Sequence, residues 1–231
     1  MQAVILAGGL GTRLWPLTKT VPKPMVPIAG TPYLEHQLRL LQQQSITDIV
    51  LLTGYLSEQI EEHFGDGSRF GISIAYSKET TPLGTGGALR QAAPLLQESF
   101  LVIYGDSYLP IQYAEVLDTL ANTSATGAVT VYDNQSEDTG VTNNIALDDG
   151  DFITKYKKDA PDDPLLQYVE AGVLAFKRSV LQRIPEGQVS LEQQIFPLLI
   201  SERGLVGHIT QERFYDIGTP ERLERIAEQL A

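Results

Sequence analysis

A glycine-rich turn and two cations near the start of the chain are residue types that can hold a phosphate. The turn, residues 8–13, has the sequence GGLGTR and directly follows the apolar run 3–7. Glycine lets backbone N–H groups approach an anion closely and accepts positive φ angles. Arg13 and Lys23 add positive charge near this turn, in a chain with 17 basic residues. Alone, the glycines fit an ordinary strand-to-loop turn equally well.

The two common nucleotide-binding motifs do not fit this turn. The dinucleotide fingerprint fails because Gly9-x-Gly11 is followed by Leu14 where a third glycine belongs. The P-loop fails because the chain contains no Gly-Lys pair. Lys23 lies between Pro22 and Pro24, which predicts an extended backbone and a fixed direction for its side chain. The alternative interpretation is that Lys23 is a surface lysine in a proline-rich loop and has no role in binding.

Two aspartates are candidate ligands for a hard cation. Asp106 follows the apolar run 100–104, and Asp216 follows the short strand-like pair Phe214-Tyr215. Open α/β sheets bind ligands at the carboxyl ends of their strands. Mg²⁺ prefers oxygen ligands and takes one or two protein carboxylates. Each aspartate alone fits a turn or helix cap equally well, so only their conjunction with the turn and the cations is informative.

These residues need a scaffold, and the hydrophobic pattern predicts an α/β fold. Short β-branched runs alternate with amphipathic runs over the first two-thirds of the chain, which is typical of a mostly parallel sheet covered by helices. Thr31 is the predicted N-cap of the first helix, whose apolar face carries Leu34, Leu38 and Leu41. The expected strands are 3–7, 49–52, 72–76, 100–104 and 128–131, and the other expected helices are 57–64, 88–93 and 116–120.

Beyond Asp133 the pattern changes. Strand-like pieces at 141–147, 152–156 and 169–176 predict a small antiparallel or mixed β elaboration in the second half. The acidic run 148–151 is typical of a solvated hairpin turn. Ser190 and Gln193 predict a capping box before another helix, and the last helix is expected to begin at Thr219. With no linker or repeat, residues 1–231 are predicted to be one domain.

Composition excludes several function classes. The 17 basic and 29 acidic residues give a net charge of −12, which argues against nucleic acid and anionic membranes as partners. The absence of cysteine excludes disulfides and thiol chemistry, and the 3 histidines are isolated, which argues against zinc. No apolar run approaches the ~18 residues of a membrane span, and no signal peptide is apparent. The expected location is the cytoplasm.

Taken together, five segments resemble the sugar-1-phosphate nucleotidyltransferase family. They are LAGGLGTRL at 6–14, PKPM at 22–25, PLGTGGA at 82–88, GDS at 105–107 and YDIGTPE at 215–221. The resemblance implies a Rossmann-like nucleotidyltransferase fold with a mixed, mostly parallel sheet. It also implies a reaction of a nucleoside triphosphate with a sugar 1-phosphate that releases pyrophosphate and uses Mg²⁺.

The resemblance also implies roles for particular residues. Arg13, Lys23 and Asp106 are expected to be catalytic, and Asp106 and Asp216 to hold the metal. The expected nucleotide-binding residues are Leu6, Ala7, Gly8, Gly9, Gly11, Thr12, Arg13, Lys23, Glu79, Pro82, Gly84 and Thr85. The expected sugar-phosphate residues are Asp106, Asn144, Lys158 and Glu170. The choice between Lys157 and Lys158 stays open, because many members have Glu-Lys-Pro where this chain has Lys157-Lys158-Asp159.

Within the family, the 82–88 segment looks most like that of mannose- or heptose-1-phosphate guanylyltransferases. Members that use uracil or thymine carry a glutamine where this chain has Glu79. A carboxylate can accept from both donors of guanine, so GTP is favoured. A uridylyl- or thymidylyltransferase acting on a hexose 1-phosphate is the alternative. The different sequence Glu170-Ala171-Gly172, where many guanylyl enzymes have asparagine first, leaves the sugar open.

Two other function classes remain to be weighed. One is a glycosyltransferase that consumes nucleotide sugars, and the other is a non-catalytic, nucleotide-binding regulatory subunit. The resemblance assigns the nucleotide to about residues 1–110 and the sugar phosphate to about 111–231, with no C-terminal β-helix domain. The oligomeric state stays open, a homo-oligomer included.

Overall fold

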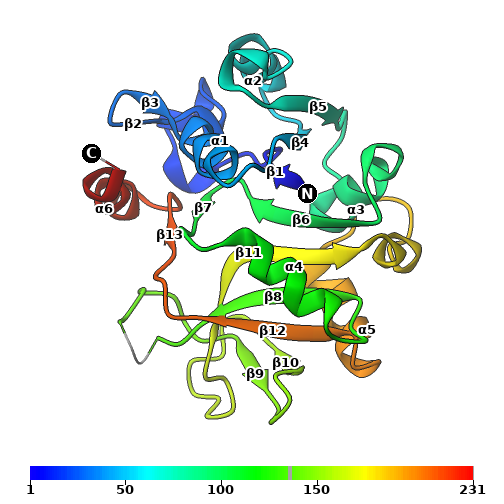
Figure 1. Ribbon diagram of the computed structural model, residues 1–231. Helices are drawn as coiled ribbons and strands as arrows, with labels where there is room; N and C mark the ends of the chain where they lie inside the picture. The colour runs from blue at the N-terminus through cyan, green and yellow to red at the C-terminus, as the bar shows by residue number, and fades with distance from the viewer. Residues whose placement is uncertain (135–136, 231) are drawn as a thin grey trace.

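A seven-stranded sheet runs through the centre of the computed structural model, which describes residues 1–134 and 137–230 (Figure 1). Its strand order is β12-β8-β11-β6-β1-β4-β5. Neighbouring strands are parallel, except that β11 is antiparallel to both β6 and β8. The strands are β1 (Gln2–Leu6), β4 (Asp48–Thr53), β5 (Ser73–Lys78), β6 (Ser99–Tyr104), β8 (Gly127–Tyr132), β11 (Val169–Lys177) and β12 (Leu205–Thr210). The predicted mixed, mostly parallel α/β sheet is confirmed.

Helices cover both faces of this sheet, so its strands alternate between two cores. In β1, Ala3 and Ile5 join the core under α1, α2 and α4, whereas Val4 joins the core under α3 and α5. Burial on both faces explains the near-continuous apolar strands of the sequence. The helices are α1 (Tyr33–Gln43), α2 (Ser57–Phe64), α3 (Gly84–Gln91), α4 (Tyr113–Ala121), α5 (Phe196–Ser201) and α6 (Pro220–Leu230). Within the described residues, every helix is too short or too polar to cross a bilayer.

The expected β elaboration is present, but it is smaller than predicted. It consists of the antiparallel strands β9 (Ile145–Leu147) and β10 (Ile153–Tyr156). Between them, Asp148 accepts hydrogen bonds from the N–H groups of Gly150 and Phe152, so the acidic run is a hairpin turn. The third expected piece is β11, which lies inside the central sheet. It bulges against β8 between Glu170 and Leu174.

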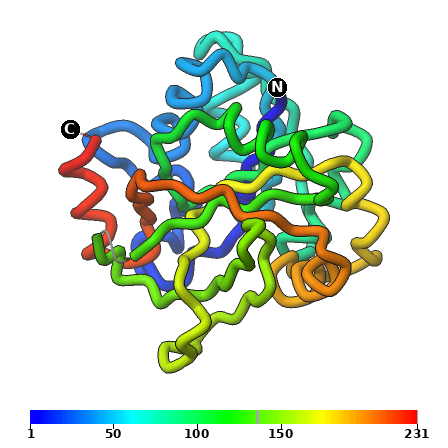
Figure 2. Tube along the Cα trace, turned by 60° about the horizontal axis from the view of Figure 1, so that its bottom comes forward, coloured from blue at the N-terminus to red at the C-terminus, as the bar shows by residue number. Residues whose placement is uncertain are grey.

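Two short strand pairs form separate small sheets outside the central one. β2 (Pro27–Ile28) pairs with β3 (Thr31–Pro32), and β7 (Ser107–Tyr108) pairs with β13 (Tyr215–Asp216). The predicted N-cap at Thr31 is wrong: Thr31 pairs with Ile28, and Pro32 takes the cap position. Helix α6 packs on this region and lies at the opposite end of the molecule from α5 (Figure 2).

The other predicted helix starts need smaller corrections. Helix α3 begins at Gly84, four residues before the expected 88. At the predicted capping box, Ser190 Oγ accepts the Gln193 N–H as expected. The Ser190 N–H donates the return hydrogen bond to Gln194 Oε1 and not to Gln193, because a π-helical turn (Leu191–Ile195) precedes α5.

We predict that Gly127→Val lowers the free energy of unfolding by about 1–3 kcal/mol. A Cβ at Gly127 would lie 2.5 Å from the Phe176 ring, which is itself fully buried between the sheet and its helices. Urea denaturation measures the change. Gly150→Ala is the control, since its nearest non-adjacent atom would be 3.4 Å away. Equal stability of both variants would contradict the packing argument.

Candidate active site

A cavity of about 320 Å³ lies where the carboxyl ends of β1, β4, β5 and β6 meet. This is the edge at which open α/β sheets bind ligands. Ten of the predicted residues line the cavity: Leu6, Ala7, Gly8, Gly9, Lys23, Glu79, Pro82, Gly84, Thr85 and Asp106. Gly11, Thr12, Arg13, Asn144, Lys158, Glu170 and Asp216 are not among its lining residues.

The floor of the cavity is built by the close approach of strand ends. The Ala7 N–H donates to Leu52 O at 2.8 Å, and the Gly105 N–H donates to Leu6 O at 3.0 Å. A Cβ on Gly105 would lie 2.4 Å from that Leu6 oxygen, so this position requires glycine. The contact sets Asp106, the next residue, beside the glycine-rich turn.

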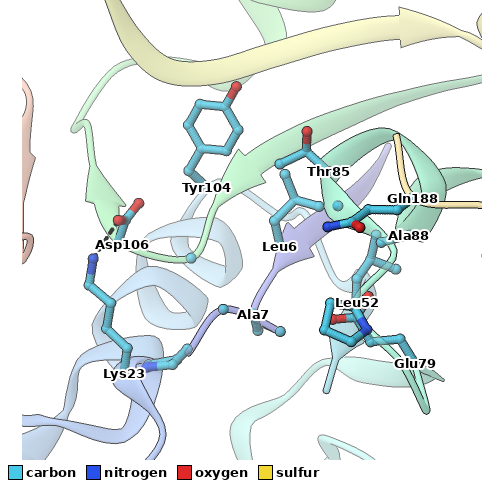
Figure 3. Close-up of a pocket in the computed structure, with 16 residues that line it drawn as sticks. Leu6, Ala7, Lys23, Leu52, Glu79, Thr85, Ala88, Tyr104, Asp106 and Gln188 are labelled. Carbon is cyan, nitrogen blue, oxygen red and sulfur yellow. Dashed lines mark hydrogen bonds and ion pairs between the residues drawn. The ribbon is translucent and has the colours of Figure 1, made fainter. Parts of the chain in front are cut away.

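Lys23 and Asp106 form an ion pair at one end of the cavity (Figure 3). Lys23 Nζ lies 2.5 Å from Asp106 Oδ2, and the lysine side chain is 11% exposed. The extended backbone predicted for Lys23 is wrong, because only Pro22 is extended and Lys23 begins a 3₁₀ turn. The Met25 N–H donates to Pro22 O and the Val26 N–H donates to Lys23 O. Gly11, at φ +64°, packs against Lys23, because a Cβ there would lie 3.0 Å from Lys23 Cβ.

Asp216 and Arg13 lie next to this ion pair. Asp216 pairs with Ser107 across β13 and β7, and the Ile217 N–H donates to Asp106 O at 3.1 Å. A Cβ on Gly218 would lie 2.7 Å from Asp216 Oδ1 and 3.3 Å from an Arg13 guanidinium nitrogen. The structure therefore brings together the four residues Arg13, Lys23, Asp106 and Asp216, from segments up to about 200 residues apart in the chain.

Asp106 and Asp216 are the candidate ligands for a magnesium ion. In residues 1–134 and 137–230, no group of three or more histidine, cysteine or acidic side chains could hold a metal. Mg²⁺ does not need such a cage, because phosphates and water complete its shell when one or two carboxylates hold it. Asp106 and Asp216 come from paired strands and supply hard oxygen atoms. Asp216 Oδ2 is held by Arg222 at 2.7 Å, which fixes the direction of that carboxylate.

Glu79 lies at the other end of the cavity from Lys23 and Asp106 (Figure 3). It directly follows β5, and its Oε2 accepts the Leu83 N–H at 2.9 Å. A Cβ on Gly8 would lie 2.9 Å from Glu79 Oε1, and one on Gly54 would lie 2.8 Å from it. The two glycines therefore make room for this carboxylate.

The glycines that open α3 accommodate a crossing segment. Gly84 is at φ +70°, and its Cβ would lie 2.5 Å from Val189 O; a Cβ on Gly87 would lie 2.4 Å from Gly187 O. Segment 187–189 thus passes close over α3 and brings Gln188 to the cavity wall. Gln188 was not predicted as a site residue, because nothing local in the sequence marks it.

Five other lining residues were also missed. Pro24, Ala88 and Gly105 stand inside the family segments quoted above, so a stricter use of those segments would have found them. Leu52 and Tyr104 are the last or next-to-last residues of β4 and β6. Their positions at the carboxyl ends of buried strands were a usable signal.

Of the four residues expected to hold the sugar phosphate, Asp106 lines the cavity, and Asn144, Lys158 and Glu170 lie together outside it. The Glu170 N–H donates to Asn144 Oδ1 at 3.0 Å, and the Tyr156 hydroxyl donates to Glu170 Oε2 at 2.7 Å. Lys158 Nζ lies 5.9 Å from the centre of the Tyr156 ring, while Lys157 contributes its backbone N–H to Asn144 O. Of the two lysines, Lys158 is the one whose charge acts on Glu170.

Glu170 is buried, not solvent-facing. Burial, and then the charge of Glu192, raise its pKa above 4.5, while the positive charge of Lys158 opposes this rise. Gly172, at φ +80°, allows the strand to bulge here, and a Cβ on it would lie 2.5 Å from Ser107 Oγ. The bulge aims Glu170 toward the tyrosines at the back of the cavity.

The fold and this site define an α/β protein with a mostly apolar cavity at the carboxyl edge of its sheet, with charged side chains at the two ends of the cavity. The model of the family described as "Nucleotidyl transferase" matches residues 2–231, and the chain belongs to this family. The resemblance seen in the sequence is confirmed at this level.

Curated relatives and solved structures are similar to the chain. A mannose-1-phosphate guanylyltransferase of Mycobacterium tuberculosis is 36% identical and aligns with 97% of this chain. A UTP–glucose-1-phosphate uridylyltransferase of Synechocystis is 33% identical over 87% of it. The chain spans only 63% and 55% of these two relatives. HddC from Yersinia pseudotuberculosis, in a crystal structure described as complexed with GMP-PN, has a TM-score of 0.82 at 24% identity, covering 100% of this chain and 99% of HddC, which confirms the fold.

We predict that Glu170→Gln stabilises the protein more as the pH rises. Below pH 4.5 the glutamate is protonated in both folded and unfolded chains. Above that pH the unfolded chain releases the proton first, because the folded pKa is raised, so the wild type loses stability relative to the variant until the pH passes the folded pKa. Urea denaturation at about pH 4 and about pH 8 tests this.

Glu202→Gln, a change at an exposed glutamate paired with Arg183, is the control for the loss of one charge. A Glu170→Gln effect that is the same at both pH values would contradict the raised pKa.

Proposed function

We propose that the chain transfers a nucleotidyl group from a nucleoside triphosphate to a sugar 1-phosphate and releases pyrophosphate. The observation that carries the proposal is the Lys23–Asp106 pair at the carboxyl edge of the sheet, with Arg13 and Asp216 beside it. Membership of the nucleotidyl transferase family supports it, as do the names of the curated relatives.

The reaction needs charge neutralisation and positioning. An oxygen of the sugar phosphate forms a bond to the α-phosphorus, and the bond from that phosphorus to the bridging oxygen of pyrophosphate breaks. Both reactants are anions, so the protein must supply positive charge and an in-line approach. No covalent nucleophile is required, which suits a chain with no cysteine.

Arg13 and Lys23 have distinct roles in this proposal. Arg13 offers a planar set of donors to the departing pyrophosphate. Lys23 acts as a point charge between the substrate phosphates, and its pairing with Asp106 holds it in place before they arrive. Asp106 and Asp216 would hold Mg²⁺, which neutralises phosphate charge when bound. Local positive charge then overcomes the net charge of −12.

Glu79 makes GTP the favoured nucleotide. The Watson–Crick edge of guanine presents two adjacent donors, which the two oxygens of a carboxylate can accept. Uracil and thymine present one donor between two carbonyl oxygens that a carboxylate repels. A mismatched buried polar group costs about 1–3 kcal/mol, or tenfold and more in preference. The curated relatives include both guanylyl- and uridylyltransferases, so our proposal that GTP is the nucleotide rests on Glu79.

Asn144, Lys158 and Glu170 are proposed to bind the sugar phosphate. They lie in the second half of the chain, whereas Lys23 and Glu79 lie in the first, in keeping with a division near residue 110. The cytoplasm is the location we propose, because the substrate is a nucleoside triphosphate. The product class would serve polysaccharide synthesis.

We expect Asp106→Asn and Asp216→Asn each to lower kcat by about 100-fold or more, since each removes an anionic ligand of the metal. The assay follows pyrophosphate release from GTP and Mg²⁺ with a panel of sugar 1-phosphates. Asp149→Asn, in the exposed β9–β10 turn, is the matched control and should keep full turnover. Near-normal turnover of either test variant at saturating Mg²⁺ would refute the metal assignment.

We expect Glu79→Gln to lower kcat/KM for GTP about tenfold or more while it raises that for UTP and dTTP. An amide can both accept from and donate to a pyrimidine, which a carboxylate cannot. The measurement is kcat/KM for the three nucleotides in the wild type and the variant. A wild type that prefers UTP or dTTP, or an unchanged ranking in the variant, would overturn the base assignment.

A further inference from the structure

Glu192 is a buried acid for which the proposed mechanism has no role. It stands in the π-helical turn before α5 and is 9% exposed. Three hydroxyl groups donate to its carboxylate: Tyr104 at 2.5 Å, Ser190 at 2.7 Å and Thr85 at 2.9 Å. Tyr104 and Thr85 line the cavity, and Glu192 does not. Glu192 therefore lies directly behind two parts of the cavity wall.

We propose that Glu192 is a positioning residue that links the nucleotide and sugar-phosphate ends of the site. This proposal rests on the function proposed above. Through Thr85 the carboxylate orients a wall of the nucleotide cavity, and through Tyr104 and its neighbour Glu170 it sets the chemistry of the sugar end.

On the nucleotide side, Glu192 fixes what Thr85 can offer a ligand. The Thr85 hydroxyl donates its proton to Glu192 and accepts the Leu191 N–H at 2.8 Å. A hydroxyl has one donor and two acceptor sites, so one lone pair is left for a ligand. Thr85 therefore accepts a hydrogen bond from the bound nucleotide and cannot donate one while Glu192 holds its proton.

On the sugar side, Glu192 adds to the effect of burial on the pKa of Glu170. Burial opposes ionisation of Glu192, but the hydrogen bonds from Tyr104, Ser190 and Thr85 outweigh it and lower its pKa. The resulting negative charge, together with burial, raises the pKa of Glu170. The other groups that face Glu170 are Lys158, Tyr104 and Tyr156, from the segment after β10, from β6 and from β10.

The raised pKa of Glu170 and the lowered pKa of Glu192 favour a neutral Glu170 beside an ionised Glu192, and this arrangement suits an anionic substrate. A neutral Glu170 can donate as well as accept, and it does not repel a sugar phosphate. Within the described part of the chain, Oε1 of Glu170 is buried and has no hydrogen-bond partner. This atom is therefore free to form a hydrogen bond with a ligand. Burial and the charge of Glu192 thus both favour the neutral form of Glu170, which is the form that suits the substrate.

The variant Glu192→Gln tests whether Glu192 links the two ends of the site, because glutamine has nearly the same shape as glutamate but carries no charge. Glutamine has one side-chain oxygen, so at least one of the three hydroxyl groups must face an NH₂ group that cannot accept. We expect KM for GTP and for the sugar 1-phosphate each to rise about tenfold, with a smaller change in kcat. The fall of kcat/KM for the sugar 1-phosphate at high pH should move to lower pH, because loss of the Glu192 charge lowers the pKa of Glu170.

Glu202→Gln is the matched control and should leave both KM values and the pH profile unchanged. A purely structural role for Glu192 would lower Tm and leave the pH profile in place. Unchanged KM values, or an unmoved profile, would overturn the proposal.

A double-mutant cycle of Glu192→Gln with Thr85→Val tests whether Glu192 acts on nucleotide binding through Thr85. If Glu192 acts through Thr85, the double variant binds GTP, measured by calorimetry without turnover, no more weakly than the worse single variant. Additive losses of GTP affinity in the two single variants would overturn the proposed action of Glu192 through Thr85. If Glu192→Gln does not fold, Ser190→Ala replaces it: the proposal requires a rise in both KM values that Ser190→Thr reverses.

An infrared pH titration separates this proposal from the proposed function. The band of the protonated carboxyl of Glu170, assigned by its loss in Glu170→Gln, should disappear at lower pH in Glu192→Gln than in the wild type. An identical midpoint overturns the link between the two acids. A wild type that releases no pyrophosphate with any sugar 1-phosphate would instead refute the proposed function, and the titration would still give its answer.

Discussion

The contact between Lys23 and Asp106 is the constraint on which the site depends. It joins the proline-rich loop to the end of β6 at 2.5 Å, across 83 positions of the chain. In a chain with 12 more acidic than basic residues, a cation stays at an anion site only where its neighbours hold it. Asp106 provides that hold and is itself aimed by the approach of Gly105 to β1. The loop, the strand end and the metal candidate therefore form one unit.

Most glycines around the cavity serve close packing of the backbone. Gly105 admits the carbonyl of Leu6, Gly84 that of Val189 and Gly87 that of Gly187, each at a distance that a Cβ would forbid. Gly8 and Gly54 make the same allowance for the Glu79 side chain. These close approaches bring backbone up to the cavity beside its apolar side chains, while the charged side chains Lys23, Asp106 and Glu79 stand at its two ends (Figure 3). A phosphate-cradling role for Gly9, whose added Cβ would meet nothing within 4 Å, remains compatible with this arrangement.

The sequence was informative where function is carried by short segments and uninformative where it arises from distant contacts. Arg13, Lys23, Asp106 and Asp216 could be named because each follows or interrupts a recognisable local pattern. Glu192 could not, since its partners Tyr104 and Thr85 are 88 and 107 positions away. The Thr31 cap failed for a similar reason: pairing with Ile28 overrode a local capping preference. The sheet was predictable from the hydrophobic pattern of its strands. The antiparallel place of β11 was not, because it depends on pairing with β6 and β8, which are distant in the sequence.

The C-terminal helix completes the site that the N-terminal loop begins. Arg222 of α6 holds Asp216 Oδ2 and donates to Gly140 O, while Ile226 packs with Ile28 and Tyr33 beneath the proline-rich loop. Tyr33 lies close enough to both aspartates that, after burial, their charges raise its pKa. The two carboxylates that fit a metal are therefore supported from below by residues of both chain ends. Asp106 is placed by the contact of Gly105 with Leu6 of β1, and Asp216 by its ion pair with Arg222 of α6, so both ends of the chain contribute to the position of the two carboxylates.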